Sequence, residues 1–369
     1  MKSLFDPNIP YDLPLLPVDG IETISIFKKL TPAARALASL NQVARLLSNQ
    51  NLLINLIPIL ESQSSSEIEN IVTTTDALFQ HDLDSSQADP ATKETLRYKK
   101  ALFLGYQLIS GDNARPLTTG TAIDICSELT DREIDVRKIT GTNLKNHRSG
   151  EIIYTPPVGE QNLRDKLSNW EKYLHEHDVD PLIALAVTHY QFEAIHPFLD
   201  GNGRTGRILN ILFLIEQKLL DQPILYLSRY IVQNKKEYYE LLLNVTRNND
   251  WEAWISFMLD AVRVTAEWTI DKTNAIVELQ KATAEFIKIN APKTYSYELL
   301  QLLFEKPYLR TKDLLDREIY RSRQAAMTNL KLLENLGVLQ IKISGKETLF
   351  INTRLLNLMR FDSNDYEPF

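Results

Sequence analysis

Apolar residues recur at helical spacing along most of this 369-residue chain, and this periodicity restricts its fold more than any other feature. The predicted helices cover residues 32–47, 52–62, 66–77, 94–110, 117–130, 161–176, 181–194, 203–218, 233–249, 252–262 and 263–288. Thr31 and Pro32 suit the N-cap and first residue of the first helix. A polar run, 63–66, predicts a break between the second and third. We therefore expect a mainly α-helical protein.

One section of the first 290 residues, 133–160, has β character instead. The apolar residues that lead into it are Ile134, Val136 and Ile139. Polar residues 146–150 predict a turn, and the run 152–154 leads out. Pro156 and Pro157 end the second strand because proline cannot continue a β-ladder. We predict a β-hairpin, or flap, in this section.

The pattern changes after Ala291-Pro292. Three helices are predicted there, followed by two β-like runs; their ranges are 297–305, 311–316, 322–336, 338–343 and 348–351. Three helices with a two-stranded hairpin are typical of a winged helix-turn-helix. We therefore predict three domains: an N-terminal arm and helical region, a central core with the helices that follow it, and a winged-helix-like domain. Their ranges are 1–94, 95–290 and 291–369.

The third helix of the C-terminal domain has a polar face and an apolar face. The outward residues are Arg321, Arg323, Gln324, Thr328, Asn329 and Lys331, and the inward ones are Ala325, Ala326, Leu330, Leu333 and Leu336. Lys342 and Lys346 lie on the wing. Arginine and amide side chains suit base edges in DNA. Nearby acidic residues dilute the basic face, so DNA binding and protein contact both stay open.

Composition limits the setting in which the chain works. A net charge of −7 argues against a chain-wide polyanion binder. Cys126 is the one cysteine, so no disulfide forms within the chain, as in a reducing compartment. The start lacks the basic and apolar regions of a signal peptide, and no run reaches the roughly 20 apolar residues of a membrane span. We expect a cytoplasmic protein in which Cys126 is a small buried residue rather than a nucleophile.

The segment His196-Pro197-Phe198-Leu199-Asp200-Gly201-Asn202-Gly203-Arg204-Thr205-Gly206-Arg207 carries the chemistry. It is predicted to be a loop that feeds a helix N-terminus, where backbone N–H groups are unpaired and the helix dipole is positive. Gly201 and Gly203 allow a ligand to approach the backbone closely. Two arginines one helical turn apart suit phosphate oxygens. The segment therefore predicts a polyphosphate site.

His196 and Asp200 add reactive groups to this cradle. A neutral histidine can accept a proton from a hydroxyl nucleophile. A single carboxylate beside phosphates is a common Mg²⁺ anchor. Base, metal and phosphate cradle together suit in-line transfer of a phosphorus group. The alternative, a tight structural loop with a core histidine, does not account for two glycines, two arginines, a histidine and an aspartate within twelve residues.

This segment resembles the core motif of the Fic family, His-x-Phe-x-Asp/Glu-Gly-Asn-Gly-Arg-x-x-Arg, and matches it at every specified position. The resemblance covers about residues 95–260. It implies a protein adenylyltransferase that uses ATP and Mg²⁺ to place AMP on Ser, Thr or Tyr hydroxyls of a target. It also implies that His196 is the base, that Asp200 holds Mg²⁺, and that the target docks at the 133–160 flap. The intact Gly-Asn-Gly stretch favours transfer of AMP over phosphate.

The resemblance implies a full set of nucleotide-binding residues. They are Asp200, Gly201, Asn202, Gly203, Arg204, Thr205, Gly206, Arg207, Tyr238 and Tyr239. Arg204 would bind the β-phosphate and Arg207 the γ-phosphate. The two tyrosines resemble those of the family's adenine pocket; packing against the core is an equally good interpretation of them.

Residues Ser65-Ser66-Glu67-Ile68-Glu69-Asn70 resemble the family's inhibitory motif, Ser/Thr-x-x-x-Glu-Gly/Asn. Ser65 and Glu69 stand four residues apart, as neighbours on one helix face. We expect Glu69 to pair with Arg207 and occupy the γ-phosphate site, because a carboxylate and a phosphate both offer two oxygens to an arginine. The alternative is a solvated acidic helix face.

Several questions stay open on the sequence alone. A second hypothesis is a nucleotide-responsive transcription regulator that binds DNA through Arg321, Arg323 and Lys331. The sequence does not decide the target protein, self-modification, dimerisation, or whether addition or removal of AMP dominates.

Overall fold

The computed structural model describes residues 5–82, 84–146, 149–344 and 347–369. Its elements follow in the order α1 (Ile24–Leu46), α2 (Asn51–Ile68), α3 (Thr75–His81), α4 (Pro90–Ser110), α5 (Thr119–Thr130), β1 (Leu144–Lys145), β2 (Ile152–Tyr154), α6 (Glu160–Glu176), α7 (Pro181–Ile195), α8 (Asn202–Glu216), α9 (Leu227–Gln233), α10 (Lys235–Asn248), α11 (Trp251–Asn290), α12 (Tyr297–Glu305), β3 (Tyr308–Leu309), α13 (Thr311–Asp316), α14 (Arg323–Asn335), β4 (Gln340–Ser344), β5 (Glu347–Ile351) and α15 (Thr353–Arg360). The fold is mainly α-helical, as predicted.

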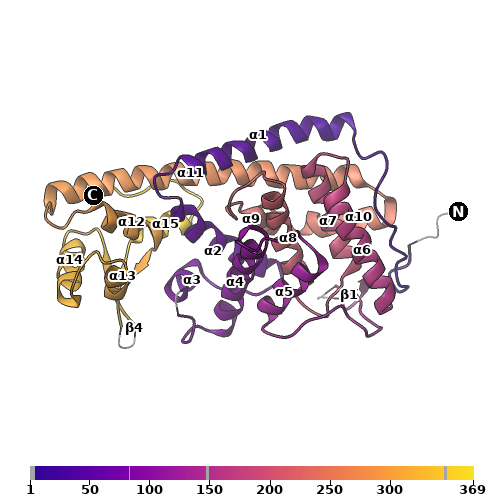
Figure 1. The fold of residues 1–369 in the computed structure, drawn as a ribbon, viewed down its shortest axis with the longest axis horizontal. Coiled ribbons are helices and arrows are strands. Elements are labelled where there is room, and N and C mark those ends of the chain that lie inside the picture. The colour runs from indigo at the N-terminus through magenta and orange to yellow at the C-terminus, as the bar shows by residue number, and fades with distance from the viewer. Residues whose placement is uncertain (1–4, 83, 147–148, 345–346) are drawn as a thin grey trace.

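The longest helix, α11, lies beside α1 along one side of the molecule (Figure 1). The prediction of two helices, 252–262 and 263–288, was wrong: α11 is one helix of 40 residues. It contains no glycine or proline, and Ala261 and Val262 at the predicted junction are buried. Nothing local therefore breaks it.

The first helix begins eight residues before the predicted Pro32 start. Its N-cap is Thr23, whose hydroxyl accepts a hydrogen bond from the Ile26 N–H at 3.3 Å. Pro32 lies inside the helix and not at its first position. Proline there removes one backbone hydrogen bond. Burial of the apolar face that includes Ile26 and Leu30 outweighs that loss.

The predicted break at 63–66 was also wrong, because α2 continues through it to Ile68. Two of the three serines that suggested a break have side-chain partners elsewhere in the fold. The Ser64 hydroxyl lies 2.7 Å from the Tyr226 hydroxyl, and Ser65 accepts hydrogen bonds from Arg207. A separate short helix, α3, begins only at Thr75 and replaces the one predicted over 66–77.

The flap contains the predicted antiparallel strand pair, in which Leu144 faces Tyr154. The apolar lead-in residues Ile134, Val136 and Ile139 are not in a strand. Val136 is instead buried, while the backbone N–H of its neighbour Arg137 donates to the Pro197 carbonyl at 2.9 Å. Residues 147 and 148 of the predicted turn lie outside the described residues. The flap therefore joins the core at the base of its first strand.

In the C-terminal region, α12, α13 and α14 stand close to their predicted positions. The antiparallel sheet has the order β3-β5-β4, so it contains one strand more than predicted. The sequence pattern also missed α9 and α15, which are only seven and eight residues long.

The faces of α14 differ slightly from the prediction. The buried inward residues are Ala326, Leu330 and Leu333, whereas Ala325 and Leu336 are half-buried. The exposed outward residues are Arg321, Arg323, Gln324, Thr328 and Lys331. Asn329 was wrongly predicted to face outward. It is half-buried, because its side-chain oxygen accepts a hydrogen bond from the Thr294 hydroxyl at 2.8 Å. Lys342 is half-buried, and Lys346 lies outside the described residues.

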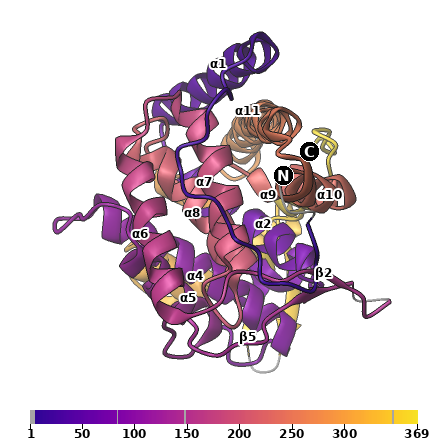
Figure 2. The same cartoon turned by 90° about the vertical axis from the view of Figure 1, so that its right-hand side faces the viewer.

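Helices α7 and α8 run through the middle of the structure and are mostly buried. The N-terminal arm crosses α6 and α7 before α1 begins (Figure 2). Lys166 donates to the Leu13 carbonyl at 2.6 Å, and Gln191 donates to the Pro14 carbonyl at 2.9 Å. The arm is thereby bound to α6 and to α7, the helix that leads into the loop before α8. Within the described part of the chain, no helix has the length and apolar character needed to cross a bilayer.

Candidate functional site

The loop between α7 and α8 is shaped by two left-handed residues. His196 ends α7 with φ 49°, and Gly201 precedes α8 with φ 80°. Inside the loop, the Phe198 N–H donates to the side-chain oxygen of Asn202 at 2.8 Å. The Asn202 amide donates back to the Phe198 carbonyl at 2.8 Å. These two hydrogen bonds close the loop, and both polar atoms of the Asn202 side chain take part in them.

The His196 imidazole lies at the C-terminal end of α7 and is half-buried. Burial and the positive charge of Arg137 lower its pKa to about 4. Because its folded pKa lies below the ordinary value near 6.5, the ring is neutral at physiological pH. A neutral ring can accept a proton from a hydroxyl group.

Asp200 is exposed at the tip of the loop. Its Oδ1 accepts a hydrogen bond from the Gly201 N–H at 2.7 Å, and its backbone carbonyl accepts one from the Cys126 thiol at 3.3 Å. Within the described ranges, no group of three or more His, Cys, Asp or Glu side chains is arranged to hold a metal. Asp200 is thus a single carboxylate, which suits a metal whose other ligands are phosphate oxygens and water.

Cys126 is buried beneath this loop, as predicted. Burial raises the pKa of its thiol to about 11. A thiol that stays protonated at neutral pH is a poor nucleophile. A side chain on Gly201 would meet the Cys126 sulfur at 3.1 Å, so glycine lets the loop sit this close to α5.

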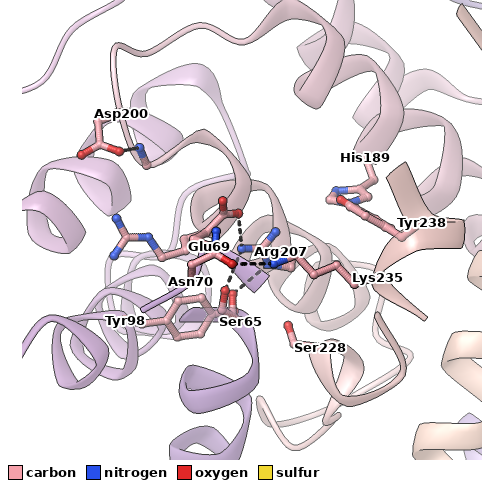
Figure 3. A network of polar contacts seen from close by, with 12 residues as sticks. Ser65, Glu69, Asn70, Tyr98, His189, Asp200, Arg207, Ser228, Lys235 and Tyr238 are labelled. Atoms are coloured by element: carbon pink, nitrogen blue, oxygen red, sulfur yellow. Dashed lines mark hydrogen bonds and ion pairs between the residues drawn. The ribbon is translucent and has the colours of Figure 1, made fainter. Parts of the chain in front are cut away.

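Arg207 is 1% exposed and is held from one side by the end of α2 (Figure 3). Its Nε donates to the Ser65 hydroxyl at 2.8 Å. Its Nη2 donates to the Ser65 carbonyl at 2.9 Å and to Glu69 Oε1 at 2.8 Å. Burial alone would raise the pKa of Glu69, but the charges of Arg207, Arg204 and Lys235 hold it below its ordinary value. Glu69 is therefore ionised at neutral pH.

The Glu69 carboxylate lies against the first turn of α8. A Cβ built on Gly203 would stand 2.4 Å from Glu69 Oε1 and 3.0 Å from Arg207 Nη1. Only glycine leaves room for an acidic group at this point. The first N–H groups of a helix have no partner within the helix, so a carboxylate here occupies a place suited to any anion.

Arg204 binds another carboxylate, that of Glu94, which sequence reasoning missed. Its Nη1 donates to Glu94 Oε1 on α4 at 2.8 Å, and its side chain is 5% exposed. Glu94 belongs to no recognisable motif, so the sequence carried no signal for this pair. Both arginines of the segment therefore have carboxylate partners within the chain.

Two further residues of the segment, Thr205 and Gly206, face the protein interior. A Cβ on Gly206 would come within 2.6 Å of Glu193 Oε1 on α7, so glycine permits close packing of α7 and α8. Burial raises the pKa of Glu193 to about 7. The sequence pattern did not predict that the Glu193 carboxyl group lies beside Gly206.

The two tyrosines of α10 have different environments. Tyr238 is buried, its hydroxyl lies 2.8 Å from His189 Nε2, and its ring packs against Trp254. Tyr239 is 44% exposed. Tyr238 thus has the surroundings of a core residue, and Tyr239 alone of the two presents an accessible ring.

Three family descriptions match successive parts of this chain. Residues 27–107 match the Fic/DOC family N-terminal region, and residues 116–214 match the Fic/DOC family. Residues 279–355 match the C-terminal domain of the SoFic-like protein adenylyltransferases. These matches cover residues 65–70, the loop with α8, and most of the C-terminal region.

Relatives and solved structures agree with these matches. A probable protein adenylyltransferase of Aquifex aeolicus is 40% identical over 76 residues, 21% of this chain and 23% of that protein. The protein adenylyltransferase Fic of Drosophila melanogaster is 28% identical over 114 residues, 30% of this chain and 22% of the relative. The chain therefore spans less than a quarter of the length of either.

The similarity to solved structures covers more of this chain than the alignments with those relatives do, and it concerns the fold. A Fic family protein from Desulfovibrio desulfuricans has a TM-score of 0.55 at 18% identity, covering 92% of this chain and 98% of that one. Fic-1 of C. elegans has a TM-score of 0.51 at 20% identity, covering 66% of this chain and 73% of that one. With the motif, the site and the successive matches in agreement, the chain belongs to the Fic family.

Proposed function

We propose that this chain is a protein adenylyltransferase that transfers AMP from ATP to a Ser, Thr or Tyr hydroxyl of a target protein, and that Glu69 inhibits it. The observation that carries the proposal is the Glu69 carboxylate, which lies against the first turn of α8 and binds Arg207 at 2.8 Å. A site that accepts an acidic side chain in this way suits a phosphate group. Two relatives that align with part of this chain are named a probable protein adenylyltransferase and the protein adenylyltransferase Fic.

The reacting groups have separate roles in this proposal. Neutral His196 accepts the proton of the target hydroxyl as its oxygen attacks the α-phosphorus of ATP. The bond from the α-phosphorus to the bridging oxygen breaks, and pyrophosphate leaves. The N-terminus of α8 and the two arginines stabilise the negative charge of the phosphates. Each arginine must exchange its present carboxylate, Glu94 or Glu69, for a phosphate oxygen or bind both.

Asp200 is the residue that would hold Mg²⁺. Its side chain is exposed, and only one of its carboxylate oxygens has a hydrogen-bond partner among the described residues. A bound Mg²⁺ would supply positive charge beside the phosphates. The other positions of its octahedral shell suit phosphate oxygens and water, so one protein carboxylate is enough.

The inhibitory contact is held in place by several groups. Asn70, which follows Glu69, is left-handed with φ 63°, and its side-chain oxygen accepts a hydrogen bond from Lys235 at 3.0 Å. Ser65 binds Arg207 through both its hydroxyl and its carbonyl. The end of α2 is thereby fixed on both sides of the carboxylate. A γ-phosphate that needs Arg207 must compete with an ion pair that is already positioned.

The target would dock at the flap, where an extended peptide can pair with a strand edge through backbone hydrogen bonds. The alternative function, nucleotide-responsive DNA binding, is favoured by the exposed Arg321, Arg323 and Lys331 at α14. A salt-dependent shift of duplex DNA that is lost when these three residues become alanine would support it.

The test of the proposed function is incorporation of AMP from α-labelled ATP and Mg²⁺ into lysate proteins or into the chain itself. We expect strong labelling by Glu69→Gly, weak labelling by the wild type, and none by Glu69→Gly combined with His196→Ala. Matched reactions with γ-labelled ATP measure phosphate transfer. Label from the γ-position without label from the α-position would overturn the assignment of AMP as the transferred group.

A further inference from the structure

Arg137 is a buried cation outside the motif, and its surroundings are unusual. It lies at the entrance to the flap and is 2% exposed. Among the described residues it has no carboxylate partner, and burial lowers its pKa. Its partners are backbone carbonyls: Nε donates to His196 at 2.8 Å, and Nη2 donates to Pro157 at 2.5 Å and to Ile195 at 3.3 Å.

A buried guanidinium group without a carboxylate needs compensation, because burial of a charge is costly. Here the compensation comes from the C-terminal end of α7. Its last carbonyls have no partner within the helix and carry the negative end of the helix dipole. Two of the three acceptors, Ile195 and His196, belong to this end. The guanidinium group is therefore stabilised by the negative end of α7.

The same contacts fix the backbone of His196. This residue is left-handed, with φ 49° and ψ 60°, a conformation that costs a non-glycine residue about 1–2 kcal/mol. The side chain of Arg137 holds the carbonyl of His196, and its backbone N–H holds the next carbonyl, of Pro197, at 2.9 Å. Arg137 therefore binds two successive backbone carbonyls at the point where the imidazole leaves the backbone.

The third acceptor of the Arg137 side chain, the Pro157 carbonyl, belongs to the flap. Pro157 follows β2 at the end of the flap, and Arg137 stands before β1 at its beginning. One guanidinium group therefore fastens both ends of the flap to the residue proposed as the base. A target that docks on the flap is held in a fixed relation to the imidazole.

We propose that Arg137 is a positioning residue of the reaction, which sets His196 in its left-handed conformation and fixes it relative to the flap. This inference rests on the proposed function, because it assigns Arg137 a part in the same transfer. It differs from a purely structural role in two ways. Positioning affects the rate more than ATP binding, since a small misplacement of a reacting group costs about 100-fold. A nearby positive charge also keeps the imidazole neutral.

The experiment compares Arg137→Met and Arg137→Lys, each in the Glu69→Gly background. The matched control is Arg164→Met, which removes an exposed arginine that pairs with Asp135 and Glu160 at the base of the same flap. The readouts are kcat and KM for AMP transfer, ATP binding by calorimetry, thermal unfolding, and the dependence of kcat on pH. The other charged groups near His196 are Glu69, which is absent from this background, and Asp200, which is unchanged.

For Arg137→Met we expect kcat to fall about 100-fold, with ATP affinity kept within about 2-fold and the acid limb of the pH profile shifted to higher pH. Arg137→Lys keeps the charge but not the three directed hydrogen bonds, so its acid limb should stay in place while kcat falls. Arg164→Met should match the parent. Equal losses of ATP binding and kcat with an unmoved acid limb would overturn the proposal, and so would an Arg137→Met enzyme as fast as the parent. If the Glu69→Gly parent itself transfers no AMP, the proposed function has failed instead.

Discussion

Replacing Glu69 by Gln is the sharpest test of the inhibitory contact, because it removes one charge and little volume. Arg207 is 1% exposed, so it loses its carboxylate partner in a place that water hardly reaches. Breaking one partner of a buried pair costs about 3–5 kcal/mol. The Glu69 side chain is 34% exposed, which weakens the pair through solvent screening. A loss of about 2 kcal/mol is therefore expected.

The energy of the pair between Glu69 and Arg207 should affect two measurements, the stability of the protein and the rate of AMP transfer. Without nucleotide, Glu69→Gln should lower the free energy of unfolding by about 2 kcal/mol, because Arg207 loses the negative charge of its carboxylate partner and keeps only neutral acceptors, the new amide oxygen and the hydroxyl and carbonyl of Ser65. In AMP transfer, the phosphate no longer competes with a charged group for Arg207. At 1.36 kcal/mol per factor of ten, the rate should rise about 30-fold.

The assays are chemical denaturation and incorporation of label from α-labelled ATP, on the same preparations. Glu67→Gln is the matched control, because Glu67 lies two residues away, is exposed and has no ion pair among the described residues. It should change neither quantity. If Glu69→Gln loses stability but gains no rate, the pair with Arg207 is structural and the inhibitory role is refuted.

Three further predictions concern the same site. His196→Ala should abolish AMP transfer in the Glu69→Gly background and leave ATP binding intact, as checked by calorimetry; loss of binding would mean that His196 supports the nucleotide rather than the reaction. Because burial and Arg137 lower the pKa of His196 to about 4, kcat in that background should stay nearly constant from pH 8 down to pH 5. A histidine with an ordinary pKa near 6.5 would already have lost about 30-fold at pH 5, so such a loss in the pH–rate profile would contradict the buried geometry. Ser65→Ala removes the hydroxyl that accepts from Arg207 at 2.8 Å, and labelling should rise about 10-fold or more, as expected for one hydrogen bond to a charged group that contributes at least about 1.5 kcal/mol; a rate below the wild type would show that Ser65 supports catalysis instead.

The sequence alone predicted the local features of the site. The loop and helix from His196 to Arg207 follow from residues that are neighbours in the chain, since glycines permit the left-handed turn and the apolar pattern of α8 begins directly afterwards. The strand pair of the flap is local in the same sense, because Pro156 and Pro157 end it. The resemblance of residues 65–70 to an inhibitory motif predicted the pairing of Glu69 with Arg207, a contact that spans 138 positions.

Tertiary structure decided the features that depend on distant partners. The serines of α2 suggested a break, since such side chains compete for backbone hydrogen bonds, but Tyr226 and Arg207 bind two of them and the helix continues. Pro32 suggested a helix start, but packing of α1 on α11 outweighs one missing hydrogen bond.

Dependence on distant partners also explains why some residues of the site were predicted from the sequence and others were missed. Arg137 and Glu94 carry no motif, and each acts through a contact with a segment 59 to 110 positions away. Spacing along a chain shows which side chains share a helix face, because that depends only on local geometry. Which buried charge meets which carbonyl or carboxylate depends on how helices pack, and only the folded chain determines that.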